Sequence, residues 1–224
     1  MTKLIPFVLI LVFWSCKSDK DLTKIYEGII EYDITYSSDS ITSVPVQFLP
    51  KKMLLQFNPH YASYKIEDMM GVFCITNTTN VSRRTHVSTI KIFNKKYKYV
   101  GKKGEVPVFF RPESVFLIKE TEDTVTLAGI QCQKSLVTDL KARRKFEVAY
   151  SEDFFIKEPN INTPYSEING ILMKFEIDLG RMRLTLTAKK IIPSQIKNQM
   201  FRIGDDYKVI NEEKMREIIA TMLR

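Results

Sequence analysis

The sequence is poor in the residues that most often bind metals or form covalent cross-links. Its 224 residues include 3 cysteines, 2 histidines and a single tryptophan. His60 and His86 lie apart in the sequence, and neither has a partner at the spacing of metal ligands. The composition therefore predicts no metal site, and we expect no bound cofactor.

The sequence also lacks the short motifs of common enzyme classes. It has no Gly-x-Ser-x-Gly elbow, no Gly-x-x-x-x-Gly-Lys phosphate loop and no Gly-x-Gly-x-x-Gly dinucleotide fingerprint. The carboxylate pairs Asp205-Asp206 and Glu212-Glu213 are explained by a solvated loop and by the start of a helix. We therefore predict a noncatalytic protein without catalytic residues. A hydrolase built from residues scattered along the chain is the enzymatic alternative.

An apolar run at residues 4–14 has the form of a secretory signal. It follows Thr2-Lys3, ends at Ser15-Cys16 and is shorter than the roughly 20 apolar residues that span a bilayer. A small residue directly before a cysteine resembles the lipobox read by lipoprotein signal peptidase, although Phe13 and Trp14 are bulkier than the usual pattern. We predict that residues 1–15 are removed and that Cys16 is lipidated. The alternative is an ordinary signal with an incidental cysteine.

Residues 16–23 form the expected tether between the lipid and a single domain at 24–224. The run 17–21 is polar and acidic, and it resembles the export tags of some Bacteroidetes lipoproteins. A plain solvated linker explains it equally well. The expected location is the outer membrane, on its periplasmic face or at the cell surface. Cys74 and Cys132 then remain either as one disulfide or as two buried thiols.

Alternation of apolar and polar residues dominates the rest of the chain. It is typical of half-buried strands, and we predict a mainly β (α+β) protein with a single antiparallel sheet. The expected strands are 26–36, 46–48, 53–57, 61–67, 71–76, 87–93, 96–100, 114–119, 124–127, 133–138, 145–150, 173–179 and 182–188. Gly180 marks a turn or a bulge between the last two.

The C-terminal segment has the pattern of an amphipathic helix. Asn211 is an expected N-cap, and apolar residues at helical spacing follow it, which predicts a helix over 211–223. The apolar stripe comprises Met215, Ile218, Ile219, Met222 and Leu223. We expect this helix to pack on the sheet, with a partner-binding or lipid-gating helix as the alternative. A second short helix is expected at 193–200, because proline is favoured in a first helical turn.

Five local patterns stand in a familiar order along the chain, at residues 27–32, 128–134, 146–150, 168–173 and 184–188. Together they resemble the GLPGLI family and related lipoproteins of the Bacteroidetes, whose fold is thought to be like that of the lipoprotein carrier LolA. The naming motif is degenerate here, since Asn169-Gly170-Ile171-Leu172 is not preceded by Leu-Pro. The resemblance implies a strongly curved, unclosed half-barrel capped by a few helices, with an apolar groove. It implies no catalytic residue.

Positive charge is concentrated in residues 69–104, which contain no acidic residue. The tentative binding residues for an anionic partner are Arg83, Arg84, Lys91, Lys95, Lys96, Lys98, Lys102 and Lys103. Such a strip could face lipid headgroups or an acidic polymer of the envelope, and nucleic acid is not expected for an exported protein. The alternative is a solvated hairpin whose lysines discourage edge pairing.

Two functional hypotheses follow from these patterns. In the first, an envelope lipoprotein binds or carries a lipid or another apolar ligand in the groove of the half-barrel. In the second, the sheet has a filled core and the protein is an interaction module for a protein or polysaccharide of the envelope. Copurifying lipid would separate the two.

Overall fold

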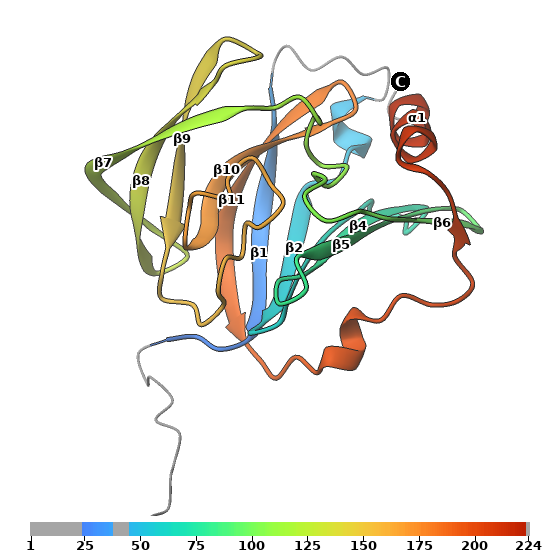
Figure 1. The fold of residues 1–224 in the computed structure, drawn as a ribbon, viewed down its shortest axis with the longest axis horizontal. Coiled ribbons are helices and arrows are strands. Elements are labelled where there is room, and N and C mark those ends of the chain that lie inside the picture. Colours follow the sequence, from blue (N-terminus) through green and yellow to red (C-terminus); the bar gives the residue numbers. More distant parts are fainter. Residues whose placement is uncertain (1–23, 38–44, 223–224) are drawn as a thin grey trace, which may run out of the picture.

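The computed structural model describes residues 24–37 and 45–222, and these form one open sheet of twelve strands (Figure 1). The predicted signal peptide and tether, together with Leu223, lie outside the described residues. The first six strands are β1 (Gly28–Tyr36), β2 (Lys52–Asn58), β3 (Tyr61–Glu67), β4 (Phe73–Asn80), β5 (Thr85–Ile92) and β6 (Lys95–Val100). The others are β7 (Phe116–Leu127), β8 (Ile130–Asp139), β9 (Arg144–Ser151), β10 (Ile171–Leu179), β11 (Met182–Pro193) and β12 (Lys208–Val209).

The sheet grows in both directions from the first strand. Its order is β12-β6-β5-β4-β3-β2-β1-β11-β10-β9-β8-β7, so β1 joins an N-terminal meander to a C-terminal one. Neighbouring strands are antiparallel except for β12, which pairs in parallel with β6 through two residues. The expectation of a wholly antiparallel sheet is therefore wrong at this edge. Figure 1 shows the sheet curving strongly, with β7 and β12 at edges that do not pair with each other.

The period-two patterns place the core on one face of this curved sheet. Ile30 and Tyr32 of β1 are fully buried, while Asp33 is exposed. The hairpin of β10 and β11 turns at Gly180, whose φ of +63° lies in the left-handed region that glycine adopts without strain. Its alternating apolar residues from Met173 to Ala188 are all buried, as their alternation predicts. The buried apolar side chains of the described residues make one cluster, apart from Ile196 and Phe201.

Three expected elements differ from the observed ones. Residues Val46–Phe48 form a 3-10 helix rather than a strand, between Pro45 and Pro50, which cannot donate to a ladder. Residues 193–200 are not a helix: β11 continues to Pro193 because Ile191 and Ile192 pair with β1, and a 3-10 helix follows at Asn198–Phe201. The two short strands expected at 114–119 and 124–127 are one strand, β7, with irregular pairing between Glu120 and Thr124.

The C-terminal helix α1 (Glu212–Met222) is capped as its sequence predicts, and it packs on the core through fewer residues than expected. The side-chain oxygen of Asn211 accepts a hydrogen bond from the Lys214 amide at 2.9 Å, which caps the helix. Met215 and Ile219 are buried, whereas Ile218 is only half-buried. The stripe that faces the core is therefore narrower than expected. Among the described residues, no helix is long and apolar enough to cross a membrane.

One buried tyrosine fills a gap in the sheet. β9 and β10 pair only near Ile171 and Lys174, and β10 has no strand partner on that side beyond this point. The Tyr165 hydroxyl donates to the Glu176 carbonyl at 2.8 Å and accepts from the Glu176 amide at 3.2 Å. A side chain thus satisfies the two backbone groups that a neighbouring strand would otherwise satisfy.

Candidate functional site

The inner face of the sheet is covered by segments that the sequence does not mark as regular structure. The segment 106–113 contributes Val108, Phe109 and Phe110 to the core, and the Phe109 carbonyl accepts a hydrogen bond from the Asp178 amide at 3.0 Å. The segment 154–168 contributes Tyr165 and four further buried apolar side chains, and α1 contributes two. Any ligand site on this face must therefore lie between covering segments.

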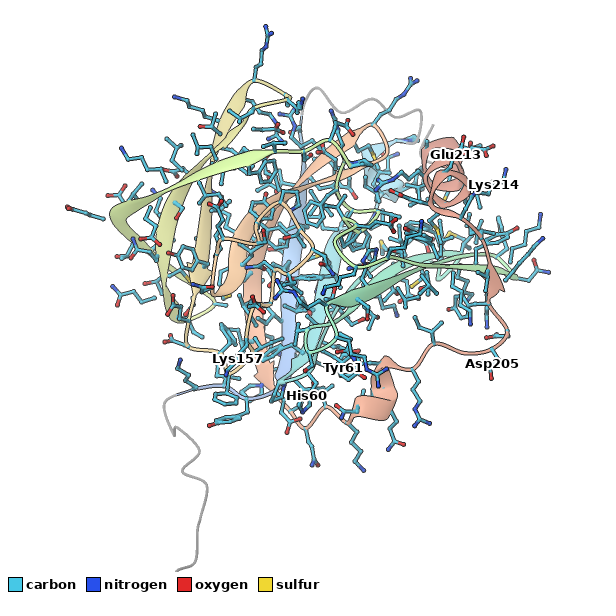
Figure 2. The ribbon with its side chains drawn as sticks, viewed as in Figure 1. His60, Tyr61, Lys157, Asp205, Glu213 and Lys214 are labelled. Carbon is cyan, nitrogen blue, oxygen red and sulfur yellow. The ribbon has the colours of Figure 1, made fainter. Side chains whose placement is uncertain are left out.

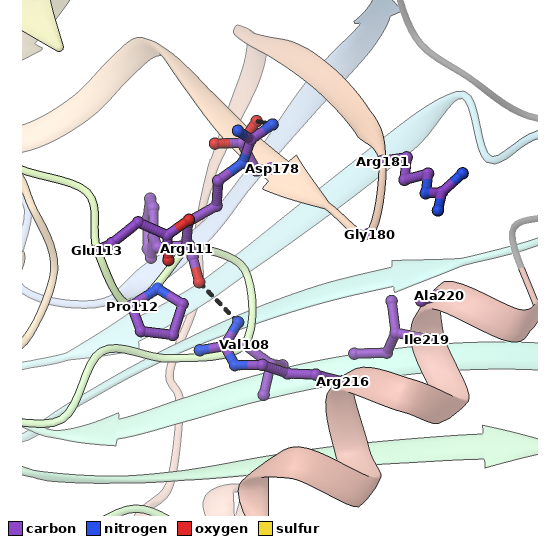
Figure 3. A pocket seen from close by; sticks show the side chains of 11 residues that line it. Val108, Arg111, Pro112, Glu113, Asp178, Gly180, Arg181, Arg216, Ile219 and Ala220 are labelled. Atoms are coloured by element: carbon purple, nitrogen blue, oxygen red, sulfur yellow. Dashed lines mark hydrogen bonds and ion pairs between the residues drawn. The ribbon is translucent and has the colours of Figure 1, made fainter. Parts of the chain in front are cut away.

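A pocket of about 330 Å³ lies between the segment 108–113, the turn at Gly180 and α1 (Figure 3). This volume is at the lower end of the range of ligand sites in proteins. The pocket is lined by Val108, Phe110, Arg111, Pro112, Glu113, Asp178, Gly180, Arg181, Arg216, Ile219 and Ala220. Three separate parts of the chain thus form one site, which we call the arginine pocket.

One wall of the arginine pocket is apolar. Val108, Phe110 and Ile219 are largely buried, and Ala220 follows Ile219 on α1. Ile219 reaches this position because it lies one helical turn beyond Met215 on the buried side of α1. An apolar portion of a ligand would lose water by contact with these side chains.

Arg216 carries a hydrogen-bond donor that no described residue uses. Its Nε donates to the Glu212 carboxylate at 2.7 Å, and its Nη1 donates to the Phe110 carbonyl at 2.8 Å. Its Nη2 is buried and has no partner in the described part of the chain. Unpaired buried donors are rare because they cost free energy, and guanidinium groups bind carboxylates and phosphates well. This donor therefore suits an anionic or strongly polar acceptor.

Arg111 and Asp178 form an ion pair at the pocket, with 3.3 Å between Nη2 and Oδ1. Asp178 occupies a position that alternation predicts to face solvent, yet it is buried. Burial raises the pKa of Asp178, and the guanidinium groups of Arg111, Arg144 and Arg183 oppose that rise. Figure 3 shows Arg111 extending toward Asp178, while Arg181 lies beyond Gly180 on the opposite side. The lining carries three arginines and two carboxylates, and Arg216 also pairs with Glu212, so the case for an anionic ligand rests on the unpaired Nη2 of Arg216.

The two histidines lie in unrelated places. His60 follows β2 at the end of the sheet away from Glu213 and Lys214 of α1 (Figure 2), and its Nδ1 is 3.4 Å from the Ser82 hydroxyl. His86 is buried on β5, and neither ring nitrogen has a partner among the described residues.

Close packing explains why His86 is held in this position. A Cβ atom built on Gly101 would lie 2.0 Å from the His86 Cε1 atom, so only glycine fits beside the ring. Desolvation lowers the pKa of His86, which keeps the imidazole neutral. Within residues 24–37 and 45–222, no group of three or more histidine, cysteine or acidic side chains is placed to hold a metal ion.

The predicted basic strip is divided by the fold. Arg83 and Arg84 lie in the turn between β4 and β5, while Lys102 and Lys103 follow β6, at the same end of the sheet. Lys91, Lys96 and Lys98 share the outer face of β5 and β6, and Lys95 begins β6 at the other end. Several of these charges are paired, because Arg84 contacts Glu158, Lys96 contacts Asp206 and Lys102 contacts Glu105. The eight residues therefore do not form one binding face.

The two described cysteines are free thiols. Cys74 lies on β4 and Cys132 on β8, with six strands between them in the sheet. Burial raises the pKa of both thiols. Of the two alternatives left open by the sequence, the structure shows the unbridged one.

Sequence reasoning did not find the arginine pocket. Arg111 and Arg216 are separated by more than 100 residues, and neither belongs to the basic strip. The available signal was the position of Arg216, next to Met215 on the edge of the apolar stripe and four residues after Glu212. Comparison with known proteins gives no independent evidence of function, because no family model and no curated protein matches the chain.

Proposed function

We propose that this protein is a noncatalytic lipoprotein of the bacterial cell envelope that binds an amphipathic molecule in the arginine pocket. The ligand has an apolar body and an anionic group. The observation that carries this proposal is the unpaired Nη2 donor of Arg216 beside an apolar wall. An acyl chain with a carboxylate or phosphate has both features, and a lipid is such a molecule.

A LolA-like half-barrel is the architecture that we propose for this binding. The open, strongly curved sheet and the helix α1 beside its inner face support that architecture. In this arrangement α1 covers the ligand, and Arg216 and Ile219 join the helix to the site. The covering segment 106–113 would complete the mouth of the groove.

The envelope location rests on the N-terminal sequence. Residues 1–15 have the order of a lipoprotein signal, and Cys16 follows a small residue. We propose that the lipid on Cys16 anchors the domain to the outer membrane. The anchor and the pocket are independent features, so that either can be tested without the other.

A second candidate function is an envelope interaction module with a filled core. The observation that favours it is the dense covering of the inner face by Phe109, Phe110 and Tyr165. In that case the arginine pocket is a surface cleft that holds only water. The same protein would then act through contacts with a protein or polysaccharide.

Native mass spectrometry of protein extracted in mild detergent distinguishes the two candidates. The first predicts a copurifying amphiphile, and the second predicts bare protein. Titration with laurate, lauryl alcohol and dodecyltrimethylammonium then tests the ligand chemistry, because the three probes share a twelve-carbon chain and differ in charge. We expect laurate to bind most tightly, by about tenfold or more, since a hydrogen bond to a charged group contributes roughly 1.5–3 kcal/mol.

Arg216→Gln should remove most of this preference for laurate. Arg202→Gln is the matched control, because Arg202 is exposed beside the 3-10 helix at the opposite end of the molecule from α1. Equal affinity for the three probes, or equal loss in both variants, would contradict the anionic part of the proposal. Failure of all three probes to bind would favour the filled core.

A further inference from the structure

Two neighbouring turns at one end of the sheet expose large apolar side chains. Met69 and Met70 lie in the turn between β3 and β4 and are 84% and 81% exposed, and Phe93 lies in the turn between β5 and β6 and is 69% exposed. We call these three residues the apolar tip. Scattered exposed apolar residues are ordinary, but a group at one place marks a contact surface.

The two turns are joined by their backbones. The Phe93 amide donates to the Val72 carbonyl at 2.7 Å, and Phe73 pairs with Ile92 in the ladder of β4 and β5. The three side chains of the apolar tip therefore project from one connected edge. The position of Phe93 relative to Met69 and Met70 is therefore set by the hydrogen bonds between β4, β5 and their turns.

Both turns hold the apolar tip in a defined conformation. The Asp68 carboxylate accepts from the Phe73 amide at 2.7 Å, and the Gly71 amide donates to the Asp68 carbonyl at 3.2 Å. Phe93 has a φ of +53°, a left-handed conformation that is strained for a bulky residue. A hairpin turn is easier to form with Asn or Gly at such a position. An exposed, strained phenylalanine is thus unfavourable for folding, and such strain is often retained for function.

Unpaired lysines stand beside the apolar tip. Lys95 directly follows the turn that contains Phe93, and Lys91 precedes it on β5. No ion pair involves Lys91 or Lys95 among residues 24–37 and 45–222, whereas Lys96 is paired with Asp206. Of the nearby acids, Glu67 pairs with Lys65 and Asp68 is engaged by the turn. The surroundings of the tip therefore carry an excess of positive charge.

We propose that the apolar tip inserts into the interfacial layer of a membrane that contains anionic lipids, with Lys91 and Lys95 at the headgroup phosphates. Methionine and phenylalanine partition into this layer, and lysine side chains extend to its charged surface. Three side chains bury far less area than a stable protein interface needs. Charge complementarity and small size thus favour a lipid surface over a second protein. The proposal does not depend on the arginine pocket.

Tryptophan fluorescence of the lipidated protein tests this inference. The protein is extracted from membranes and reconstituted into vesicles of phosphatidylcholine with or without phosphatidylglycerol, and brominated acyl chains serve as quenchers. Phe93→Trp reports on the tip. Leu117→Trp is the matched control, because Leu117 is 60% exposed on the edge strand β7, away from the apolar tip and from the residues that follow the tether. The unsubstituted protein provides the background emission.

We expect bromolipid quenching and a blue shift for Phe93→Trp in phosphatidylglycerol vesicles, and little change for Leu117→Trp. Replacing Lys91 or Lys95 by Gln should shift the equilibrium between inserted and free tip by about fivefold each, since a lysine near an anionic surface contributes roughly 1 kcal/mol. Absent quenching, equal quenching of both variants, or quenching independent of phosphatidylglycerol would overturn the proposal. A blue shift that grows with protein concentration without lipid would overturn it too, because it would show contact between copies.

The result is separable from that of the pocket. Laurate titration reports on Arg216 and Ile219, whereas quenching reports on the turn between β5 and β6, where Phe93 lies. Loss of one response with retention of the other identifies which inference fails.

Discussion

Replacing Tyr165 by Phe should destabilise the protein strongly, although the substitution removes only one oxygen atom. The Tyr165 ring is fully buried, and its hydroxyl satisfies both the amide and the carbonyl of Glu176. Phenylalanine keeps the ring and leaves two backbone groups without partners where β10 lacks a neighbouring strand. An unsatisfied buried group costs about 1–3 kcal/mol. Two such groups are left, so the expected loss in the free energy of unfolding is about 2–6 kcal/mol.

Urea unfolding followed by circular dichroism measures this loss as a lower midpoint with an unchanged slope. Tyr61→Phe is the control, because Tyr61 stacks on Phe201 and its hydroxyl has no hydrogen bond among the described residues. The control should change stability by less than about 0.5 kcal/mol. A similar small change for Tyr165→Phe would refute the idea that this hydroxyl completes the sheet. A lower slope would instead show a change in the extent of unfolding.

Three further predictions concern other parts of the chain. Stability should fall as the pH drops below about 6.5, because the pKa of His86 is lowered in the fold and only the unfolded chain takes up the proton; His86→Phe should flatten that part of a melting-temperature curve. Ile219→Ala should cost about 2–5 kcal/mol in urea unfolding, and more than Ile218→Ala, since only Ile219 is buried; equal costs would contradict the packing of α1. Mature protein should show no tryptophan emission, because Trp14 is the only tryptophan, and Cys16→Ala should remain an unlipidated precursor; intact mass spectrometry that finds Trp14 retained would exclude the processing.

Most strands can be predicted from the sequence because the alternation of apolar and polar residues within a strand reflects which of its side chains are buried. From Met173 to Leu179 in β10 and from Met182 to Ala188 in β11, every second residue is apolar, and this pattern is visible without knowledge of the partner strand. Long-range pairing explains the failures. Pro193 appeared to begin a helix, yet β1 extends alongside Ile191 and Ile192 and draws β11 past the expected end. The parallel pairing of β12 involves two residues, which is too short to leave a periodic signal.

The candidate site was less predictable than the fold for a related reason. Arg111 and Arg216 line one pocket only because α1 packs beside the segment 108–113 in the folded protein, so no local sequence pattern contains both. Asp178 follows the alternation of an exposed residue, but the segment 106–113 covers it. The basic strip was visible because its residues are close in sequence, and the fold then separated them. The site was therefore hardest to predict where the segment 106–113 and α1, which are distant in the sequence, pack together over the sheet.

The two edges of the sheet differ in what they permit between molecules. At one edge, β12 and the Ile210 amide occupy the middle of β6, so another strand cannot add there along its length. At the other edge, the twelve residues of β7 have β8 on one side only. Association through strands would therefore join β7 to β7 of a second molecule and end at a dimer. A fibre needs two open edges on every copy, and in this protein β12 blocks one of the two edges.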